Sequence, residues 1–594
     1  MRHHPTRARS ALLLMVVVSL SGPLVGCGGG GEGGGGGISL TGRTFEAGAG
    51  GMYFSLTVDA AGRFTVVARD APAIAVSGGQ GTLGADGRFF TQTPDGSVQF
   101  SGTVASNGQS AACRVTRGAT TRDATGTLVP PDRATDTVAG SYFGEAAAVS
   151  ASLSVDPTGH GTLFATTGAV TGGGRVNVAA DGTLSAPDGA MAGQLVRAGT
   201  TFRLKLTRLA GTTVAVDLAV ARTTRARWTF LVFLNAANDL QEFGPLNVNQ
   251  MEKIGSTGDV NLVVQWKQAH CATCGTPEWV GTRRYYITKD SDTGRVNSQL
   301  VQDMGPSIDM GDWRELRNFI VWTQQRYPAD RYALVIWNHG AGWRNTRGDR
   351  RAPMPRSVSI DDSTRNEIQV WELPQALDVT PQMDMVIFDA SLMQMLEVAY
   401  EIRNSSRIMV GSEESPPGEG YVYDRFLADL AANPALSPAA FGQSIVTRTL
   451  EAYGTSNNLT QSALDLSRIQ AVANQVNAFA GTLSLNIDGS RAAMVDARNE
   501  AESYAYPENK DLWDYAARIR AGSPSRDLQS SAAAVQAAVE AAVIIERHGT
   551  INANSHGIAI YIPSPDAYLT SYANLAFARA TVWDSWLQEQ PRSK

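Results

Sequence analysis

The sequence lacks three features that would place it in a common class of protein at once. Its 594 residues carry 50 Lys and Arg against 56 Asp and Glu, so it has no positive excess to attract nucleic acid. Beyond residue 27, no apolar run is long enough to span a bilayer. Cysteine is scarce, with four residues in the whole chain. The length predicts two to four domains, and 43% hydrophobic with 18% charged residues is ordinary globular composition.

The first 27 residues have the pattern of an export signal. MRHHPTRARS is basic, and ALLLMVVVSLSG is apolar but too short to span a bilayer. The segment ends in LVGC, residues 24–27, which resembles the bacterial lipoprotein box, in which the cysteine is lipidated and becomes the mature N-terminus. The alternative is a plain secretory signal with a chance cysteine. Residues 28–37, GGGGEGGGGG, form a flexible tether. We therefore expect an exported protein, anchored through Cys27 to the bacterial envelope at the outer membrane or cell surface.

Three cysteines remain after the signal: Cys113, Cys271 and Cys274. HCATC, residues 270–274, offers a local disulfide, free thiols or half of a metal site. Zinc takes about four ligands, and the chain lacks a second cluster of Cys and His. We therefore expect no zinc.

Residues 38–224 are rich in Gly, Thr, Val, Ala and Ser, with short alternating runs between turn signals. A tandem repeat is visible here. SLTVDAAG at Ser55 matches SLSVDPTG at Ser152, and ADG and PDG recur with them, at offsets of 97, 95 and 93 residues. We predict two related all-β modules, 38–133 and 134–224, built as sandwiches or small barrels. Nothing in them indicates catalysis, and a spacer or adhesion role is the simplest interpretation.

The pattern changes at residue 225, where helical segments begin to alternate with apolar runs. Helical patterns occupy 311–327, 370–377 and 392–403. The region after 437 is mainly helical, including 530–548, with one late strand at 557–563. The runs between them indicate strands buried on both faces of a parallel sheet: WTFLVFLNA (228–236), VNLVVQW (260–266), YALVIWNHG (332–340), MDMVIFDAS (383–391) and RIMVGSEE (407–414). Residues 225–594 therefore form a predicted doubly wound α/β domain with a helical C-terminal part.

Polar side chains collect where these predicted strands end. Ligands bind at the carboxyl ends of strands in open α/β sheets, so a site is expected at this edge. His339, followed by GAG, is placed to act as a general base for a nucleophile on a neighbouring strand. The polar residues at the four strand ends are Asn235, Asn238 and Asp239; Asn338 and His339; Asp389 and Ser391; and Ser412, Glu413, Glu414 and Glu419.

Six blocks of the α/β region resemble, in order, the clostripain family of cysteine peptidases, within the caspase, legumain and gingipain superfamily. The resemblance covers about 226–590. Its blocks are FLNAANDL, ALVIWNHGAGW, SIDDSTRNEIQVWEL, VIFDASLMQMLEVAYEIR, MVGSEESPPGEGYVYDRFL and GIAIYIPSP with the following YANLAFARATVWDSWL. It implies a caspase-like fold and a His/Cys dyad that cuts peptides or proteins after basic residues.

The resemblance also implies the role of each site residue. The family histidine falls on His339, and the backbone near Gly340 would supply the oxyanion hole. The family nucleophile falls on Ser391, where a cysteine is the rule. The acidic pocket for a basic P1 side chain falls on Asp389 and Glu419, with Glu where Asp is usual. We expect Ser412 and Glu413 to line this pocket.

Serine at position 391 leaves three interpretations open. A thiol is partly thiolate near neutral pH, whereas a hydroxyl needs a closely held base. In the first interpretation, the domain is a silent pseudopeptidase that binds basic peptides. In the second, it is a working serine enzyme in which Asp239 or Glu413 orients His339. The third interpretation is an altered residue in a sequence that otherwise encodes a cysteine peptidase. Ser391 is also a good N-cap for a helix over 392–403, whose N-terminus would stabilise an anion there.

Two further segments raise weaker hypotheses. The basic stretch RNTRGDRRAPMPR, residues 344–356, is either a solvated loop or a processing segment. IDDS, residues 360–363, and the pair Asp309 and Asp312 are candidates for calcium, which clostripain uses, but they lack EF-hand spacing. We therefore expect no cofactor other than a possible calcium ion.

Overall fold

A computed structural model describes most of the chain after residue 42, and its described residues belong to one compact unit, Ser39–Lys594. The export signal with Cys27, the tether, Cys271 and Cys274 lie outside the described residues, so the predictions about them stay predictions. None of the described helices is long and apolar enough to cross a membrane. The described ranges are 43–49, 52–59, 62–70, 75–84, 86–93, 96–129, 139–146, 149–198, 201–222, 226–269, 279–344 and 357–592.

Module 1, residues 43–129, is an antiparallel sheet of eight strands in the order β4-β3-β2-β1-β8-β7-β6-β5. Its inward side chains form a core of its own, with Phe54, Phe64 and Phe100 at its centre. The motif SLTVDAAGRFTV contributes to β2 and β3, which pair antiparallel. The strands are β1 (Arg43–Ala49), β2 (Met52–Val58), β3 (Arg63–Asp70), β4 (Ala75–Thr82), β5 (Arg88–Gln92), β6 (Val98–Val104), β7 (Ser110–Arg117) and β8 (Thr120–Leu128).

Module 2, residues 139–222, is a closed eight-stranded barrel with a separate core that includes Leu153, Leu163 and Leu204. The repeated motif makes β10, a turn and β11, so the second copy occupies the same place in its module as the first. The predicted all-β repeat is confirmed. The strands are β9 (Gly140–Ala146), β10 (Val149–Val155), β11 (His160–Thr166), β12 (Thr171–Val178), β13 (Thr183–Ser185), β14 (Ala192–Ala198), β15 (Thr201–Leu209) and β16 (Thr212–Arg222).

The C-terminal domain is built on a nine-stranded mixed sheet, in the order β20-β19-β18-β17-β21-β24-β25-β26-β28. The five predicted apolar strands are its centre, and they pair in parallel: β17 (Ala226–Ala236), β18 (Val260–Gln268), β21 (Ala329–Trp337), β24 (Met383–Asp389) and β25 (Ser406–Gly411). Antiparallel strands extend both edges: β19 (Gly281–Tyr286), β20 (Gln299–Gly305), β26 (Thr460–Asp465) and β28 (Val543–His548).

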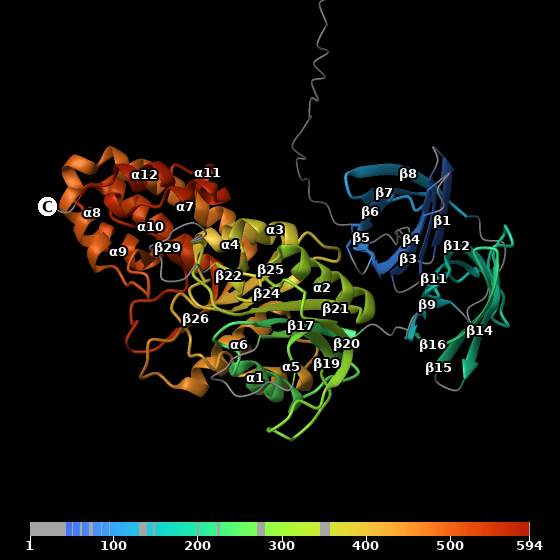
Figure 1. The fold of residues 1–594 in the computed structure, drawn as a ribbon. Helices are drawn as coiled ribbons and strands as arrows, with labels where there is room; N and C mark the ends of the chain where they lie inside the picture. The colour runs from blue at the N-terminus through green and yellow to red at the C-terminus, as the bar shows by residue number, and fades with distance from the viewer. Residues whose placement is uncertain are drawn as a thin grey trace, which may run out of the picture. The chain divides into compact units, whose positions relative to one another are not determined.

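Side chains of the central strands alternate between two hydrophobic cores, one on each face of the sheet. On β17, Leu231 and Phe233 belong to one core, and Phe230 and Val232 belong to the other. Helices α1 (Phe243–Glu252), α5 (Tyr423–Ala432) and α6 (Pro438–Tyr453) cover one face, and α2 (Trp313–Arg326), α3 (Leu373–Ala376) and α4 (Leu396–Ile402) cover the other (Figure 1). Both faces are therefore buried, as continuous apolar strands predict.

The remaining elements gather beyond α4, at the orange and red end of the chain in Figure 1. They are α7 (Ile469–Leu485), α8 (Ile487–Glu500), α9 (Leu512–Gly522), α10 (Arg526–Ala542), α11 (Ala576–Ala580) and α12 (Trp583–Glu589). Two small sheets pair β22 (Val358–Asp361) with β23 (Asn366–Ile368) and β27 (Asn509–Asp511) with β29 (Ala559–Tyr561). Short 3-10 turns occupy Val370–Glu372, Leu466–Arg468, Pro565–Ala567 and Thr570–Asn574.

Two predicted helices are wrong at one end. The helix expected over 530–548 stops at Ala542, and the next six residues are strand β28, which pairs with β26. The helix expected over 392–403 begins only at Leu396. The second difference affects the site, because it removes Ser391 from the helix terminus.

Candidate active site

His339 follows strand β21 and is held by a carboxylate from the neighbouring strand. Its Nε2 lies 2.5 Å from Oδ1 of Asp239, which follows β17. The two strands pair in parallel, so both residues leave the sheet at the same edge. The imidazole is 16% exposed and the Asp239 side chain is 62% exposed. Asp239 and Glu413 are the two residues predicted to orient the imidazole. The structure shows Asp239 hydrogen-bonded to it.

Three asparagines at these strand ends have a structural role. The side-chain amides of Asn235, Asn238 and Asn338 each donate a hydrogen bond of 3.0 Å to the carbonyl of Ile360 on β22. Asn338 Oδ1 also accepts the Ile360 N–H at 3.0 Å. These bonds fasten β22 across the ends of β17 and β21, and so position the segment that carries His339.

Ser391 lies in a turn after β24, and the histidine segment packs directly against it. The backbone of Gly340 is so close that a Cβ added there would come within 2.4 Å of the Ser391 carbonyl oxygen. A Cβ on Gly342, which has φ +62°, would meet the Met395 sulfur and the Leu392 carbonyl. Only glycine allows this approach at either position. The predicted base and the predicted nucleophile therefore come from adjoining segments.

The N-cap predicted for Ser391 is wrong. Helix α4 begins five residues later and takes Met395 as its N-cap residue. Leu392 has φ +64°, a left-handed conformation that a leucine rarely adopts, so the chain turns sharply after Ser391. Helix dipole stabilisation of an anion at Ser391 therefore has no support, and α4 itself is only seven residues long.

This turn is stabilised by the segment that follows β25. The Leu392 N–H donates to the Glu414 carbonyl at 3.3 Å, and the Gln394 N–H donates to the Ser412 carbonyl at 3.1 Å. Ser391 itself is half-buried. Within the described ranges its hydroxyl makes no hydrogen bond with another side chain, which leaves the oxygen available to a ligand.

Asp389 is a buried carboxylate beside this turn. Its Oδ2 accepts hydrogen bonds from the Tyr423 hydroxyl at 2.8 Å and the Tyr421 N–H at 3.2 Å. Burial raises the pKa of Asp389 to about 6, and the two hydrogen bonds lower it in part. Gly420, with φ +70°, lies over the carboxylate, where a Cβ would come within 2.8 Å of Oδ2. In the described part of the chain no Lys or Arg forms an ion pair with Asp389.

Glu419 adjoins Gly420 and is exposed, so its segment brings a second carboxylate beside Asp389. Helix α1 holds this segment: Asn247 Nδ2 donates to the Glu419 carbonyl at 2.9 Å, and Asn247 Oδ1 accepts from Trp337 Nε1 at 2.7 Å. The Tyr453 hydroxyl donates to the Gly420 carbonyl at 2.7 Å. Sequence reasoning missed Asn247, Trp337 and Tyr453, because no local motif marks hydrogen bonds between residues 172, 90 and 33 positions apart.

Ser412 and Glu413 do not line an open pocket, contrary to prediction. Ser412 is fully buried and shares a hydrogen bond of 3.0 Å with the Thr460 hydroxyl. Glu413 is buried too, and its Oε2 accepts the Gly557 N–H at 3.2 Å. Burial first, and then the charge of Asp511, raises the pKa of Glu413 well above its ordinary value. Both residues therefore belong to the interior of the domain.

The segments considered for calcium have internal partners. The Lys267 ammonium lies 2.6 Å from Asp361 Oδ2 and donates to the Ile308 carbonyl and the Ser363 hydroxyl. Asp309 accepts hydrogen bonds from Thr364 and Asn366. Asp312 is the N-cap of α2. A lysine ammonium thus occupies the place beside Asp361 that a cation would take. The described ranges hold no group of three or more His, Cys, Asp and Glu arranged for a metal ion.

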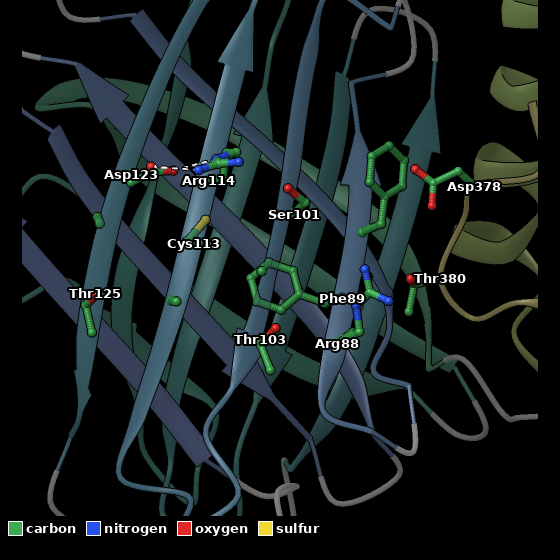
Figure 2. A pocket seen from close by; sticks show the side chains of 14 residues that line it. Arg88, Phe89, Ser101, Thr103, Cys113, Arg114, Asp123, Thr125, Asp378 and Thr380 are labelled. Carbon is green, nitrogen blue, oxygen red and sulfur yellow. Dashed lines mark hydrogen bonds and ion pairs between the residues drawn. The ribbon is translucent and has the colours of Figure 1, made fainter. Parts of the chain in front are cut away.

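A separate cavity of about 530 Å³ opens on module 1 (Figure 2). Residues of β5–β8 form most of its lining, with the Arg114–Asp123 ion pair of 2.7 Å on its surface. The lining includes Cys113, and burial raises the pKa of this thiol to about 12, so the thiolate is scarce at neutral pH. The cavity contains none of the predicted catalytic residues.

Comparison with known proteins places the C-terminal domain among peptidases. A sequence profile described as the clostripain family matches residues 232–589. Clostripain of Hathewaya histolytica is 31% identical over 135 residues, which are 21% of this chain and 25% of clostripain, so the match spans a quarter of that relative.

Two solved structures are similar at low identity. One is an inactive zymogen C11 protease from Parabacteroides distasonis, with 20% identity over 60% of this chain and 99% of that chain, and a TM-score of 0.46. The other is a secreted C11 cysteine protease from Bacteroides thetaiotaomicron bound to an irreversible peptide inhibitor. It has 20% identity over 61% and 100% of the two chains, and a TM-score of 0.45.

Proposed function

This chain belongs to the clostripain family, and from that premise we propose that its C-terminal domain recognises peptides through an Arg or Lys side chain. The observation that carries this proposal is the Asp389 carboxylate, which is buried two residues before Ser391 with no cationic partner in the described residues. Burying a carboxylate without a cation is costly. A guanidinium or ammonium entering from a substrate would supply the missing charge, and the exposed Glu419 would attract it.

The same geometry presents the peptide to Ser391. With a basic side chain at Asp389, the following peptide bond lies at the turn where the Gly340 and Ser391 segments meet. The Gly340 N–H would face the carbonyl oxygen as the oxyanion hole, because the N–H groups of His339 and Ala341 donate to Asn338 Oδ1 and to the Ser357 carbonyl. A serine hydroxyl has little anionic character at neutral pH, so we propose that the domain binds such peptides and cuts them poorly. This is the caspase-like arrangement with its sulfur replaced by oxygen.

A second function, slow serine-type hydrolysis, is favoured by the hydrogen bond between Asp239 and His339. A carboxylate that holds the histidine is what a serine nucleophile needs. In this mechanism the Ser391 oxygen attacks the carbonyl carbon, and His339 accepts its proton and delivers it to the leaving amine. Water then releases the acyl group from Ser391.

Fluorogenic peptides with Arg, Lys or Gln at P1 separate these functions, using the wild-type chain, Ser391→Cys and Ser391→Ala. The binding proposal predicts turnover of Arg and Lys peptides only by Ser391→Cys, at a rate at least about 100-fold above wild type. Wild-type turnover that Ser391→Ala abolishes would establish the serine enzyme instead. Cleavage of the Gln peptide at the Arg rate would contradict the basic pocket.

We also propose that Cys27 is lipidated and holds the protein in the bacterial envelope, on the strength of LVGC and the glycine tether. The test is membrane fractionation with incorporation of a labelled fatty acid. Cys27→Ala should lose the label and leave the membrane fraction, whereas Cys113→Ala should keep both. Unlabelled wild-type protein would contradict the anchor.

A further inference from the structure

The two β modules meet through the repeated motif itself, and their contacts come in matched pairs. The repeat offset of 97 residues makes Thr57 equivalent to Ser154, and Thr65 equivalent to Thr162. Thr57 is the cross-strand partner of Thr65 in module 1, as Ser154 is of Thr162 in module 2. Between the modules, the Thr57 hydroxyl bonds to that of Thr162 at 2.8 Å, and the Thr65 hydroxyl bonds to that of Ser154 at 2.8 Å. When each residue is replaced by its equivalent in the other module, the first hydrogen bond becomes the second.

The hydroxyls of Thr44 and Ser141 are related by the same repeat offset. Thr44 bonds to Thr57 at 3.0 Å, and its equivalent Ser141 bonds to Ser154 at 2.7 Å. Thr44 also donates across the boundary to Asp156 Oδ2 at 2.7 Å. All of these side chains are buried. Because a buried hydroxyl without a partner is costly, a network that pairs them defines one arrangement of the modules.

The apolar contacts are matched as well. Val67 and Phe164 are equivalent at the offset of 97, and Gly78 and Gly173 are equivalent at the offset of 95. Val67 pairs with Gly78 across β3 and β4, as Phe164 pairs with Gly173 across β11 and β12. A Cβ on Gly78 would come within 2.6 Å of the Phe164 ring, and a Cβ on Gly173 within 3.1 Å of Val67. Each module thus places one bulky side chain over the glycine of the other.

Ion pairs between the modules border this contact. Arg175 of module 2 lies 3.2 Å from Glu46 of module 1, and Arg69 of module 1 lies 3.5 Å from Asp188 of module 2. Each module supplies one arginine and one carboxylate, but the two ion pairs are not exchanged by the repeat offset, so they lie beside the symmetric contact and are not part of it. An interface in which both sides use the same patch is the kind that two-fold symmetric dimers form.

We infer that each β module carries a self-complementary surface whose partner is the neighbouring copy of the repeat, and that modules 1 and 2 are joined through it into a single body with local two-fold symmetry. The sequence alone predicts two β modules with a spacer or adhesion role. The paired modules form one body that follows the tether and precedes the C-terminal domain in the sequence. This inference is independent of what Ser391 does.

Disulfide trapping in the full chain tests the pairing. One variant carries Thr57→Cys with Thr162→Cys, and the other carries the symmetry-related Thr65→Cys with Ser154→Cys. Both should form an intramolecular disulfide under mild oxidation, seen as linked peptides by mass spectrometry, because hydroxyls in contact place the two Cβ atoms within disulfide reach. Thr103→Cys with Thr162→Cys is the control, since Thr103 is exposed on β6. Failure of both pairs to exceed the control would overturn the interface, and success of only one would overturn its symmetry.

A bulky substitution at Gly78, followed by a compensating truncation of Phe164, tests the apolar contact. In the chain with Thr65→Cys and Ser154→Cys, Gly78→Leu should slow disulfide formation by about tenfold, because its side chain overlaps the Phe164 ring. Adding Phe164→Ala should restore the rate, whereas Thr103→Leu should leave it unchanged. Unfolding of module 1 by the leucine would not be reversed by trimming a ring in module 2. An unchanged rate with Gly78→Leu, or no recovery with Phe164→Ala, would overturn the inference.

Discussion

Asp239 Oδ1 and His339 Nε2 lie 2.5 Å apart at the carboxyl edge of the sheet. An ionised carboxylate only accepts hydrogen bonds, so a neutral His339 that bonds to it carries its proton on Nε2. The lone pair then lies on Nδ1, which is the nitrogen that would take the proton of residue 391 in the proposed mechanism. In the proposed mechanism, the pair therefore determines which ring nitrogen would act as the base. The orientation of His339 would serve a cysteine at position 391 as well as a serine.

Replacing Asp239 by Asn in the Ser391→Cys chain should lower kcat by up to about fivefold, because an exposed pair contributes about 1 kcal/mol or less. KM should stay unchanged, since Asp239 contacts the base and not the P1 pocket. Steady-state kinetics with an Arg peptide measures both constants. Glu242→Gln, an exposed acid in the same segment, is the matched control and should change neither. An effect confined to KM would contradict the orienting role.

Binding of Arg peptides should weaken as pH falls through about 6. Burial raises the pKa of Asp389 to about 6, so the empty pocket is charged above this pH and neutral below it. A cationic side chain binds the charged form, and protons compete with it. Affinity should therefore drop by up to about tenfold per pH unit below 6. Fluorescence anisotropy with a labelled Arg peptide measures this from pH 5 to pH 8.

Asp389→Asn is the matched control for that titration. It keeps the size of the side chain and removes its charge, so binding should be weak and independent of pH over the same range. A wild-type affinity that does not change between pH 5 and pH 8 would show that Asp389 does not contact the cation.

The sequence predicted those parts of the fold that local patterns determine. The five parallel strands were recognisable because burial on both faces makes most of their residues apolar. Strand β28 was missed because Val543–His548 continues an alanine-rich helical pattern, and only its pairing with β26, about 80 residues away, makes it a strand. Glu413 was predicted to line the pocket, and this prediction also failed because distant contacts determine its position. Residues around Asp511 enclose it, and nothing near Glu413 in the sequence indicates that contact.

Removing the Lys267 ammonium should destabilise the C-terminal domain strongly. Lys267 and Asp361 are 2% and 0% exposed and lie 2.6 Å apart, so Lys267→Met leaves a buried carboxylate without a cation. Such a loss costs about 3–5 kcal/mol. Urea unfolding, followed by tryptophan fluorescence, measures the change. Arg114→Ala is the control: its pair with Asp123 is about 60% exposed on both sides, so its loss should leave the stability nearly unchanged. Equal effects of the two substitutions would contradict the role of burial.

Glu397 should make the stability of the same domain depend on pH. Its Oε1 accepts hydrogen bonds from the Tyr561 N–H at 2.9 Å and the Tyr572 hydroxyl at 2.8 Å. Burial raises its pKa to about 7 from an ordinary value of 4.5, so the folded state binds a proton that the unfolded state releases. The resulting stability is fully present below about 4.5 and is lost as pH rises through about 7.

Glu397→Gln removes this titration and keeps the Oε1 acceptor. Its stability relative to wild type should therefore rise with pH, by up to about 3 kcal/mol between pH 5 and pH 8. Urea unfolding at both pH values measures the difference, with the exposed Glu500→Gln as the control that should show no such trend. If Glu397 were instead ionised in the folded state at pH 5, the difference between Gln and wild type would be the same at both pH values. The two hydrogen bonds from tyrosines would then outweigh the cost of burying the charge.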